Sequence, residues 1–230
     1  MSTPQHRPSP ERVQQALAAA NASTRLRAAM AAGTYPHTQL LDPLLDRAAI
    51  EPDFFVRDML TWALTRHPAT RTVPRLLAEL DSDRGQARSQ ALHTLSKIGA
   101  GQAWQAVRGR LQDPDPEVAR SAWRAAVVLA PIEERAEVIR SLGALLGHGD
   151  REVRLSLSRA LITLASSTES AGRALHATLE AAAISPDPAV REHASATESL
   201  WHDPDAGFEV SVAQAQKVRA RAVDPQGQAG

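Results

Sequence analysis

The chain has 230 residues and no cysteine, and its 26 basic residues balance its 26 acidic residues. The lack of cysteine excludes disulfide scaffolds, zinc–thiolate sites and cysteine nucleophiles, and the balanced charge argues against a protein dedicated to binding polyanions. Hydrophobic residues make up 43% of the chain but aromatic residues only 3%, so we expect a folded protein that is neither a β-sandwich nor a β-barrel.

The sequence shows no targeting or membrane segment. Residues 1–10 are polar and rich in proline, without the apolar stretch of a signal peptide. The longest apolar run, residues 125–132, is far shorter than the roughly 20 residues that a membrane span needs. We therefore predict a cytoplasmic protein with no membrane partner.

In chain order, apolar residues at helical spacing alternate with helix breakers, which predicts an all-α protein. The first helices of successive pairs are expected at residues 11–20, 40–49, 73–80, 103–111, 132–146 and 172–184. Each is followed by an Asx residue with an arginine shortly after it. These residues are Asn21, Asp53, Asp83, Asp115, Asp150 and Asp187, at steps of 32, 30, 32, 35 and 37 residues. The recurrence predicts six units of helix, turn and helix.

The Asx residues are predicted to cap the second helices. Their side chains accept hydrogen bonds from the unpaired N–H groups of a first helical turn. Pro116 and Pro188 directly follow two of them, at a position where the missing N–H is not needed. We expect Asp115→Ala and Asp187→Ala each to cost on the order of 1 kcal/mol, and Asp113→Ala to cost less.

Two segments resemble the inter-helix turn of HEAT repeats: DPDPEV at residues 113–118 and SPDPAVR at residues 185–191. The resemblance extends over residues 10–202. It implies a right-handed α-solenoid of about six HEAT-like helix pairs. We expect residues 1–9 to be disordered, and residues 203–230 to form a loop, a short helix and a loose tail.

An arginine column is expected along one face of the stacked units. Arg25, Arg57, Arg154 and Arg191 share one position after the Asx residue, and Arg88 and Arg120 come one residue later. In HEAT-like stacks such arginines resemble a ladder that bonds the Asp of a neighbouring unit. A column that binds phosphate is the alternative, although it would favour a surplus of positive charge.

The tryptophans divide into core and surface candidates. Trp104 and Trp123 share helix faces with apolar residues and are predicted to be buried, and Trp201 is predicted to close the last unit. Trp62 lies well off the apolar face of its helix. It is either a binding anchor, as exposed tryptophans often are, or it packs on the second helix of the next unit.

No catalytic or metal-binding motif occurs in the sequence, and His176 with Glu180 offers only two ligands at helical spacing. We expect no cofactor and no enzymatic activity. The prediction is a scaffold that binds a protein or peptide on a concave face formed by the second helices. The candidate binding residues are Asp58, Thr61, Trp62, Thr65, Ser89, His93, Ser96, Arg124, Ser158, Glu192 and Ser195.

Two other functions remain open at this stage. HEAT-like alkylpurine DNA glycosylases hold DNA on a concave face lined with tryptophan and an acid, and the pair Asp58 and Trp62 is faintly similar. The neutral charge makes nucleic acid a less favoured partner. HEAT-like bilin lyases are the second alternative.

Overall fold

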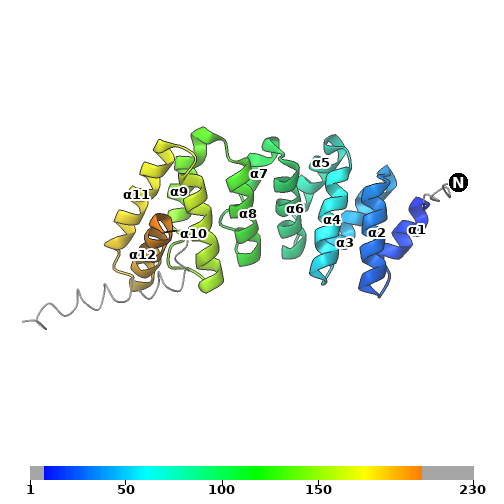
Figure 1. Cartoon of the computed structure of the whole chain (residues 1–230), viewed down its shortest axis with the longest axis horizontal. Coiled ribbons are helices and arrows are strands. Elements are labelled where there is room, and N and C mark those ends of the chain that lie inside the picture. Colours follow the sequence, from blue (N-terminus) through cyan, green and yellow to red (C-terminus); the bar gives the residue numbers. More distant parts are fainter. Residues whose placement is uncertain (1–7, 204–230) are drawn as a thin grey trace, which may run out of the picture. The chain divides into compact units, whose positions relative to one another are not determined.

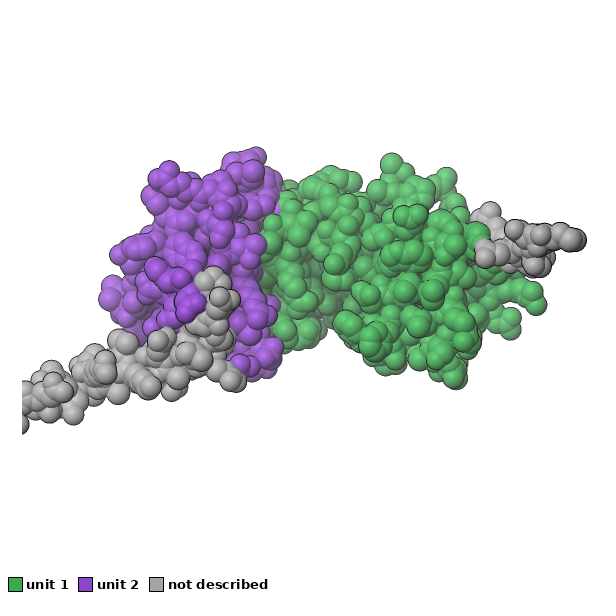
Figure 2. All heavy atoms as spheres, in the orientation of Figure 1, with its two compact units in different colours: residues 1–129 green, residues 130–230 purple. Residues whose placement is uncertain are grey.

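The computed structural model describes residues 8–203, and these residues form twelve α-helices packed in six consecutive pairs (Figure 1). The helices fall into two compact units, residues 1–129 and 130–230 (Figure 2). The predictions for residues 1–7 and 204–230, including the short helix near the C-terminus, lie outside the described residues. The all-α repeat of helix pairs is confirmed.

Unit 1 contains four pairs. Its first helices are α1 (Pro10–Leu17), α3 (Leu41–Ala48), α5 (Ala69–Glu79) and α7 (Trp104–Arg108). Its second helices are α2 (Ala22–Thr34), α4 (Phe54–Arg66), α6 (Gly85–Ile98) and α8 (Pro116–Leu129). Each second helix packs against the next one along the chain, so that α2, α4, α6 and α8 form one layer.

Unit 2 contains two pairs. The first helices are α9 (Arg135–Gly143) and α11 (Glu169–Ala183), and the second helices are α10 (Arg151–Ala165) and α12 (Pro188–His202). Short 3₁₀ helices, η1 (Thr38–Leu40), η2 (Gly101–Ala103) and η3 (Ile132–Glu134), precede α3, α7 and α9. The two units together include the repeat expected over residues 10–202, and its treatment as one domain stays a prediction.

Five of the six predicted Asx caps are present. Three of them accept a hydrogen bond from the third N–H of their helix, and two accept from the second N–H. The acceptors are Asn21, Asp53 and Asp150 in the first group and Asp115 and Asp187 in the second, at 2.8–3.2 Å. In the second group proline is the first helical residue. Because these bonds are local, the pattern predicts the helix starts reliably.

The predicted cap at Asp83 is wrong. Helix α6 begins at Gly85, and Arg84, which precedes it, makes no capping bond with its side chain. A Cβ atom on Gly85 would lie 2.0 Å from Oδ2 of Asp115, so only glycine permits this approach of α8. Counted from Gly85, Arg88 is the fourth helical residue, as Arg25 is in α2.

The arginine at the fourth helical position folds back onto the turn before its helix. Its guanidinium donates to carbonyl oxygens of that turn, at 2.6–3.0 Å. The residues that do so are Arg25, Arg57, Arg88, Arg154 and Arg191. Arg120 is the fifth residue of α8 and instead pairs with Glu117. The main role of the series is therefore to close each turn.

Only two of these arginines also reach an acid of the next pair, which corrects the predicted ladder. Arg25 pairs with Glu51 and Arg88 with Asp113, and neither acid is a helix cap. Both acids lie two residues before the capping Asp, and each accepts the backbone N–H of that Asp. The arginine–acid bonds therefore link the first helix pair to the second and the third to the fourth. In both cases the acid is not the capping Asp that was expected.

The position of Asp113 reverses the expected order of the substitution costs, in which Asp113→Ala was to cost less than the cap substitutions. Its side chain is 1% exposed and holds the guanidinium of Arg88 at 2.9 Å and 3.1 Å. We now expect Asp113→Ala to cost about 2–3 kcal/mol, because it leaves a charge-assisted bond unmade, against about 1 kcal/mol for Asp187→Ala. Urea melts of the two variants test this order, and an equal loss would contradict it.

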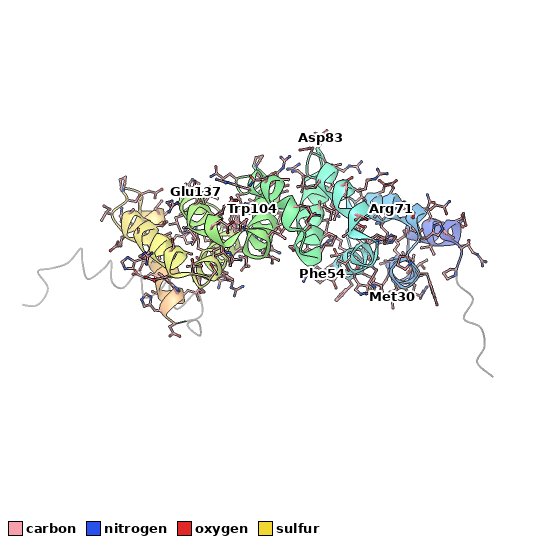
Figure 3. All side chains as sticks on the ribbon, turned by 90° about the horizontal axis from the view of Figure 1, so that it is seen from above. Met30, Phe54, Arg71, Asp83, Trp104 and Glu137 are labelled. Atoms are coloured by element: carbon pink, nitrogen blue, oxygen red, sulfur yellow. The ribbon has the colours of Figure 1, made fainter. Side chains whose placement is uncertain are left out.

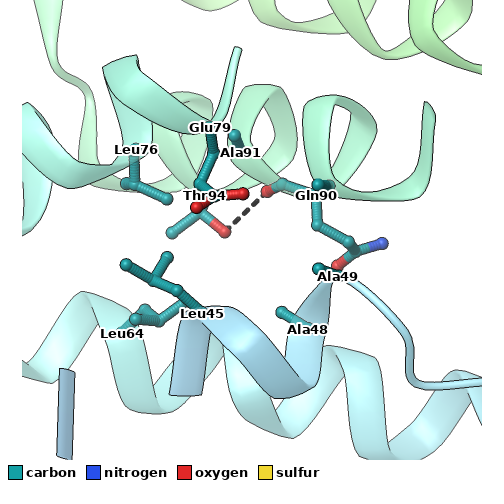
Figure 4. A pocket seen from close by; sticks show the side chains of 10 residues that line it. Leu45, Ala48, Ala49, Leu64, Leu76, Glu79, Gln90, Ala91 and Thr94 are labelled. Atoms are coloured by element: carbon teal, nitrogen blue, oxygen red, sulfur yellow. Dashed lines mark hydrogen bonds between the residues drawn. The ribbon is translucent and has the colours of Figure 1, made fainter. Parts of the chain in front are cut away.

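The core of unit 1 is closely packed. Alanine and leucine side chains from α3, α4, α5 and α6 meet around a space of about 10 Å³ (Figure 4). Such a space holds no more than one water molecule. This space is therefore too small for any ligand larger than water.

Candidate protein-binding surface

Most of the predicted binding residues are at least partly exposed on the second helices. In unit 1, Asp58, Trp62 and Arg124 are exposed, and a further set is half-buried: Thr65, Ser89, His93 and Ser96. In unit 2, Glu192 and Ser195 are half-buried on α12. Ser89 on α6 shares a hydrogen bond of 2.8 Å with Ser121 on α8, which occupies its hydroxyl within the fold.

Thr61 is 4% exposed and is no binding residue. It was predicted to face a partner because it lies beside the apolar face of α4. However, α4 contacts both α2 and α6 along its length, so the buried part of its surface is wider than its leucine side chains indicate.

Ser158 is completely buried and is likewise no binding residue. Its hydroxyl lies 3.1 Å from Nε2 of His193 and 2.8 Å from Oγ1 of Thr197, both on α12. The polar side chain of Ser158 therefore joins α10 to α12. An outward position cannot be distinguished from a buried, hydrogen-bonded one by spacing alone.

His193 is neutral in the folded protein. The backbone N–H of Gly147 donates to its Nδ1 at 3.0 Å, so the ring proton is on Nε2, 3.0 Å from the carbonyl oxygen of Arg154. Burial lowers the pKa of His193 to about 4, outweighing the bond to the Arg154 carbonyl, which raises it. A second proton would be on Nδ1, where it would face the N–H of Gly147, and two donors that face each other repel.

This pKa makes the stability of the folded chain depend on pH. The unfolded state takes up the proton near the ordinary histidine pKa of 6.5 and the folded state only near 4. Stability should therefore fall as the pH drops from 6.5 towards 4, by on the order of 3 kcal/mol in total. Urea midpoints between pH 7 and pH 5 measure the slope.

His193→Gln should reduce that slope, whereas His176→Gln, at an exposed site on α11, should leave it unchanged. Equal slopes for the parent chain and His193→Gln would show that other groups cause the pH dependence.

Trp62 lies partly against the preceding second helix. A Cβ atom on Gly33 of α2 would come within 2.2 Å of the indole ring, so the absence of a side chain at Gly33 makes room for it. The remaining surface of Trp62 is open, and the residue is 40% exposed. Trp62 thus packs on the helix before it, α2, a contact that neither sequence alternative included.

Three other apolar side chains accompany Trp62, and none was among the predicted binding residues. Phe55 is 71% exposed and Met30 47% exposed, and Met59 is half-buried. Phe55, Met59 and Trp62 follow one another at steps of four and three residues, which places them on one face of α4. We call Met30, Phe55, Met59 and Trp62 the apolar patch.

Figure 3 shows Met30 and Phe54 on one side of unit 1 and Asp83 on the opposite side. Phe54, at the start of α4, lies beside the patch: its ring meets that of Phe55 edge to face at 5.7 Å, and the guanidinium of Arg57 lies 6.0 Å from its centroid. The apolar character of this surface therefore extends to the first turn of α4.

Positive charge lies next to the patch on α6 and α8. Burial lowers the pKa of His93, and Lys97 and Arg124 lower it further, while Asp58 raises it. Burial and the charge of Arg120 lower the pKa of Arg124. Among residues 8–203, Lys97 and Arg124 form no ion pair. The two cations therefore lack an anionic partner within this part of the fold.

Unit 2 contains a shallow groove of about 550 Å³ between α9, α11 and the start of α12. Small side chains form most of its lining, among them Ala144, Ala177 and Ala181. Arg140 and His148 are at its border.

The described residues contain no group of three or more His, Asp or Glu that could hold a metal ion. None of the helices over residues 8–203 is long and apolar enough to cross a membrane.

No protein-family model matches the chain, and no curated protein matches it either. Among solved structures it is similar to an engineered protein of the Northeast Structural Genomics Consortium, with 19% identity, a TM-score of 0.45 and coverage of 89% of this chain and 96% of that one. A second engineered protein from the consortium gives 20% identity and a TM-score of 0.44 over 84% of this chain and 58% of its own.

The complex of CpcE and CpcF of phycocyanin lyase from Nostoc gives 18% identity and a TM-score of 0.48, over 94% of this chain and 89% of that one. The fold is a repeat of helix pairs of the HEAT-like type. That description rests on the twelve helices and their caps.

Proposed function

We propose that the protein is a non-enzymatic scaffold of the cytoplasm that binds a protein or peptide on the second helices of unit 1. One observation carries the proposal: the indole of Trp62 is fixed against Gly33 but remains 40% exposed beside other exposed apolar side chains. Tryptophan is enriched among the residues that dominate binding energy. Clustered exposed apolar side chains are typical of interaction sites.

Affinity capture from the native cell with the full chain as bait tests the proposal. Trp62→Ala and Phe55→Ser should each lose a partner that the parent chain retains. Ile184→Ser provides the matched control, because Ile184 is 86% exposed at the end of α11 in unit 2. If the parent retains no protein specifically, or Trp62→Ala retains everything that Ile184→Ser does, the proposal is wrong.

A further inference from the structure

The layer of second helices in unit 1 carries a row of side chains whose character changes along it. Met30, Trp62, His93 and Arg124 are each the ninth residue of their helix, in α2, α4, α6 and α8 respectively. Successive helices of this layer are in contact. Along the row, the apolar side chains on α2 and α4 are followed by the imidazole of His93 on α6 and by the cation Arg124 on α8.

Arg124, at the cationic end of the row, forms no ion pair among residues 8–203. The pKa of Arg124 is lowered by burial and by Arg120, which means that its charge is partly desolvated and repelled. The charge of Glu117 raises the pKa of Arg124, but Glu117 already accepts a hydrogen bond from Arg120. In addition, Nε of Arg120 is buried without a hydrogen-bond partner. A carboxylate placed beside Arg124 would offset the repulsion between the two arginines.

The apolar end favours a different part of the same ligand. Trp62 and its neighbours in the apolar patch offer contacts to aliphatic or aromatic side chains, and Asp58, exposed between Phe55 and Trp62, would repel a carboxylate. Electrostatic complementarity thus sets the direction of the ligand: apolar side chains over α2 and α4, acidic side chains over α6 and α8.

We infer that this row binds an acidic amphipathic peptide segment of a partner protein, with its apolar side chains on the apolar patch and its carboxylates at Arg124 and Lys97. The inference rests on the proposed function and adds the chemistry of the ligand. Three helix-to-helix steps span about 25–30 Å. That distance corresponds to about nine extended residues or about 18 helical residues.

The direct experiment selects peptides from a displayed random library on the full-length chain. The peptides have about 18 residues, which is the length of a helix that spans the row. Selected peptides should be enriched in Asp, Glu and large apolar residues and depleted in Lys and Arg. Their affinities for the chain and its variants are then measured by fluorescence anisotropy of labelled peptides.

Two sets of substitutions separate the ends of the row. Arg124→Glu and Lys97→Glu should each weaken binding about tenfold, whereas Arg71→Glu, an exposed arginine on α5 in the other helix layer, should change it less than twofold. Trp62→Ala should weaken binding about thirtyfold. Phe55→Ser provides a second apolar variant at a site that is 71% exposed and does not support the core.

Charge exchange gives the sharpest outcome. Peptides whose acids are changed to lysine should lose affinity for the parent chain and regain it on the double variant Lys97→Glu/Arg124→Glu. If selected peptides show no acidic bias, or if Arg71→Glu weakens them as much as Arg124→Glu, the inference is wrong although the proposed function stands.

If no peptide binds saturably, the inference is wrong, and the proposed function is then decided by the affinity capture alone. Binding of duplex DNA that depends on salt and is lost in Arg124→Glu, together with no acidic peptide binding, would replace the inference with nucleic-acid binding at the same row.

Discussion

Glu51→Gln is expected to lower the free energy of unfolding by about 3–5 kcal/mol, the usual cost of leaving a buried charge without its counter-ion. The carboxylate is fully buried and accepts hydrogen bonds from Arg25 at 2.6 Å and 2.7 Å and from Arg47 at 2.7 Å. It also accepts the backbone N–H of Asp53 at 2.9 Å. The substitution leaves Arg25, itself 5% exposed, with its charge uncompensated.

The pKa of Glu51 gives this prediction a second measurement. Burial raises that pKa, but the bonds from Arg25, the Asp53 backbone and Arg47 outweigh it and lower the pKa from 4.5 to about 2. Because the folded pKa is the lower one, the stabilisation is present above pH 4.5 and is lost as the pH falls towards 2. Glu51→Gln should flatten this part of the pH profile.

Asp42→Asn is the matched control, since Asp42 pairs with Arg75 in the same unit but both side chains are 58% exposed. Its loss should stay below about 1 kcal/mol. Urea melts followed by far-ultraviolet circular dichroism compare the two variants. Similar losses would mean that the buried network contributes no more to stability than a surface pair.

The fold could be predicted from the sequence because its signals are local. A capping Asx and an arginine four residues after it act within about one turn of chain and recur in most of the six helix pairs, and in two pairs proline is the first residue of the second helix. Where the local signal is ambiguous the prediction failed: Asp83 resembles a cap, but the helix begins at Gly85, whose lack of a side chain accommodates Asp115 from another helix.

Glu51 and Asp113 were missed as structural residues, although the sequence contains a signal for them. Each forms the start of an acid–proline–aspartate segment, residues 51–53 and 113–115, and Ser185 occupies the same position before Asp187. In all three segments the first side chain accepts the N–H of the Asp, at 2.9–3.2 Å. The partner arginine lies 25 or 26 residues earlier, a separation that only the folded chain explains.

The candidate surface could be predicted only in part. Helical spacing located Trp62 correctly outside the core, but it did not reveal the contact with Gly33 or the burial of Thr61 and Ser158. These depend on how neighbouring second helices pack against one another. The spacing of Phe55, Met59 and Trp62 does place the α4 part of the apolar patch on one helix face. However, apolar residues at such spacing more often indicate a buried core.

Trp123→Ala is expected to cost about 3–5 kcal/mol, the range for removing a large aromatic side chain from a core. Trp123 is 3% exposed, and its indole N–H donates to the carbonyl oxygen of Leu111 at 2.8 Å, which joins α8 to the turn that follows α7. The substitution therefore leaves a cavity and an unpaired carbonyl. Trp123→Phe should cost less, about 1–3 kcal/mol, since it keeps most of the volume and loses the bond.

Trp62→Ala is the informative comparison, because it removes the same side chain from a site that is 40% exposed. The contact with Gly33 means that its cost is not zero, and we expect about 1 kcal/mol. Thermal and urea melts of the three variants rank them directly. If Trp62→Ala destabilises the chain as much as Trp123→Ala, then the indole of Trp62 belongs to the packing between α2 and α4, and its exposed surface is no evidence of a partner.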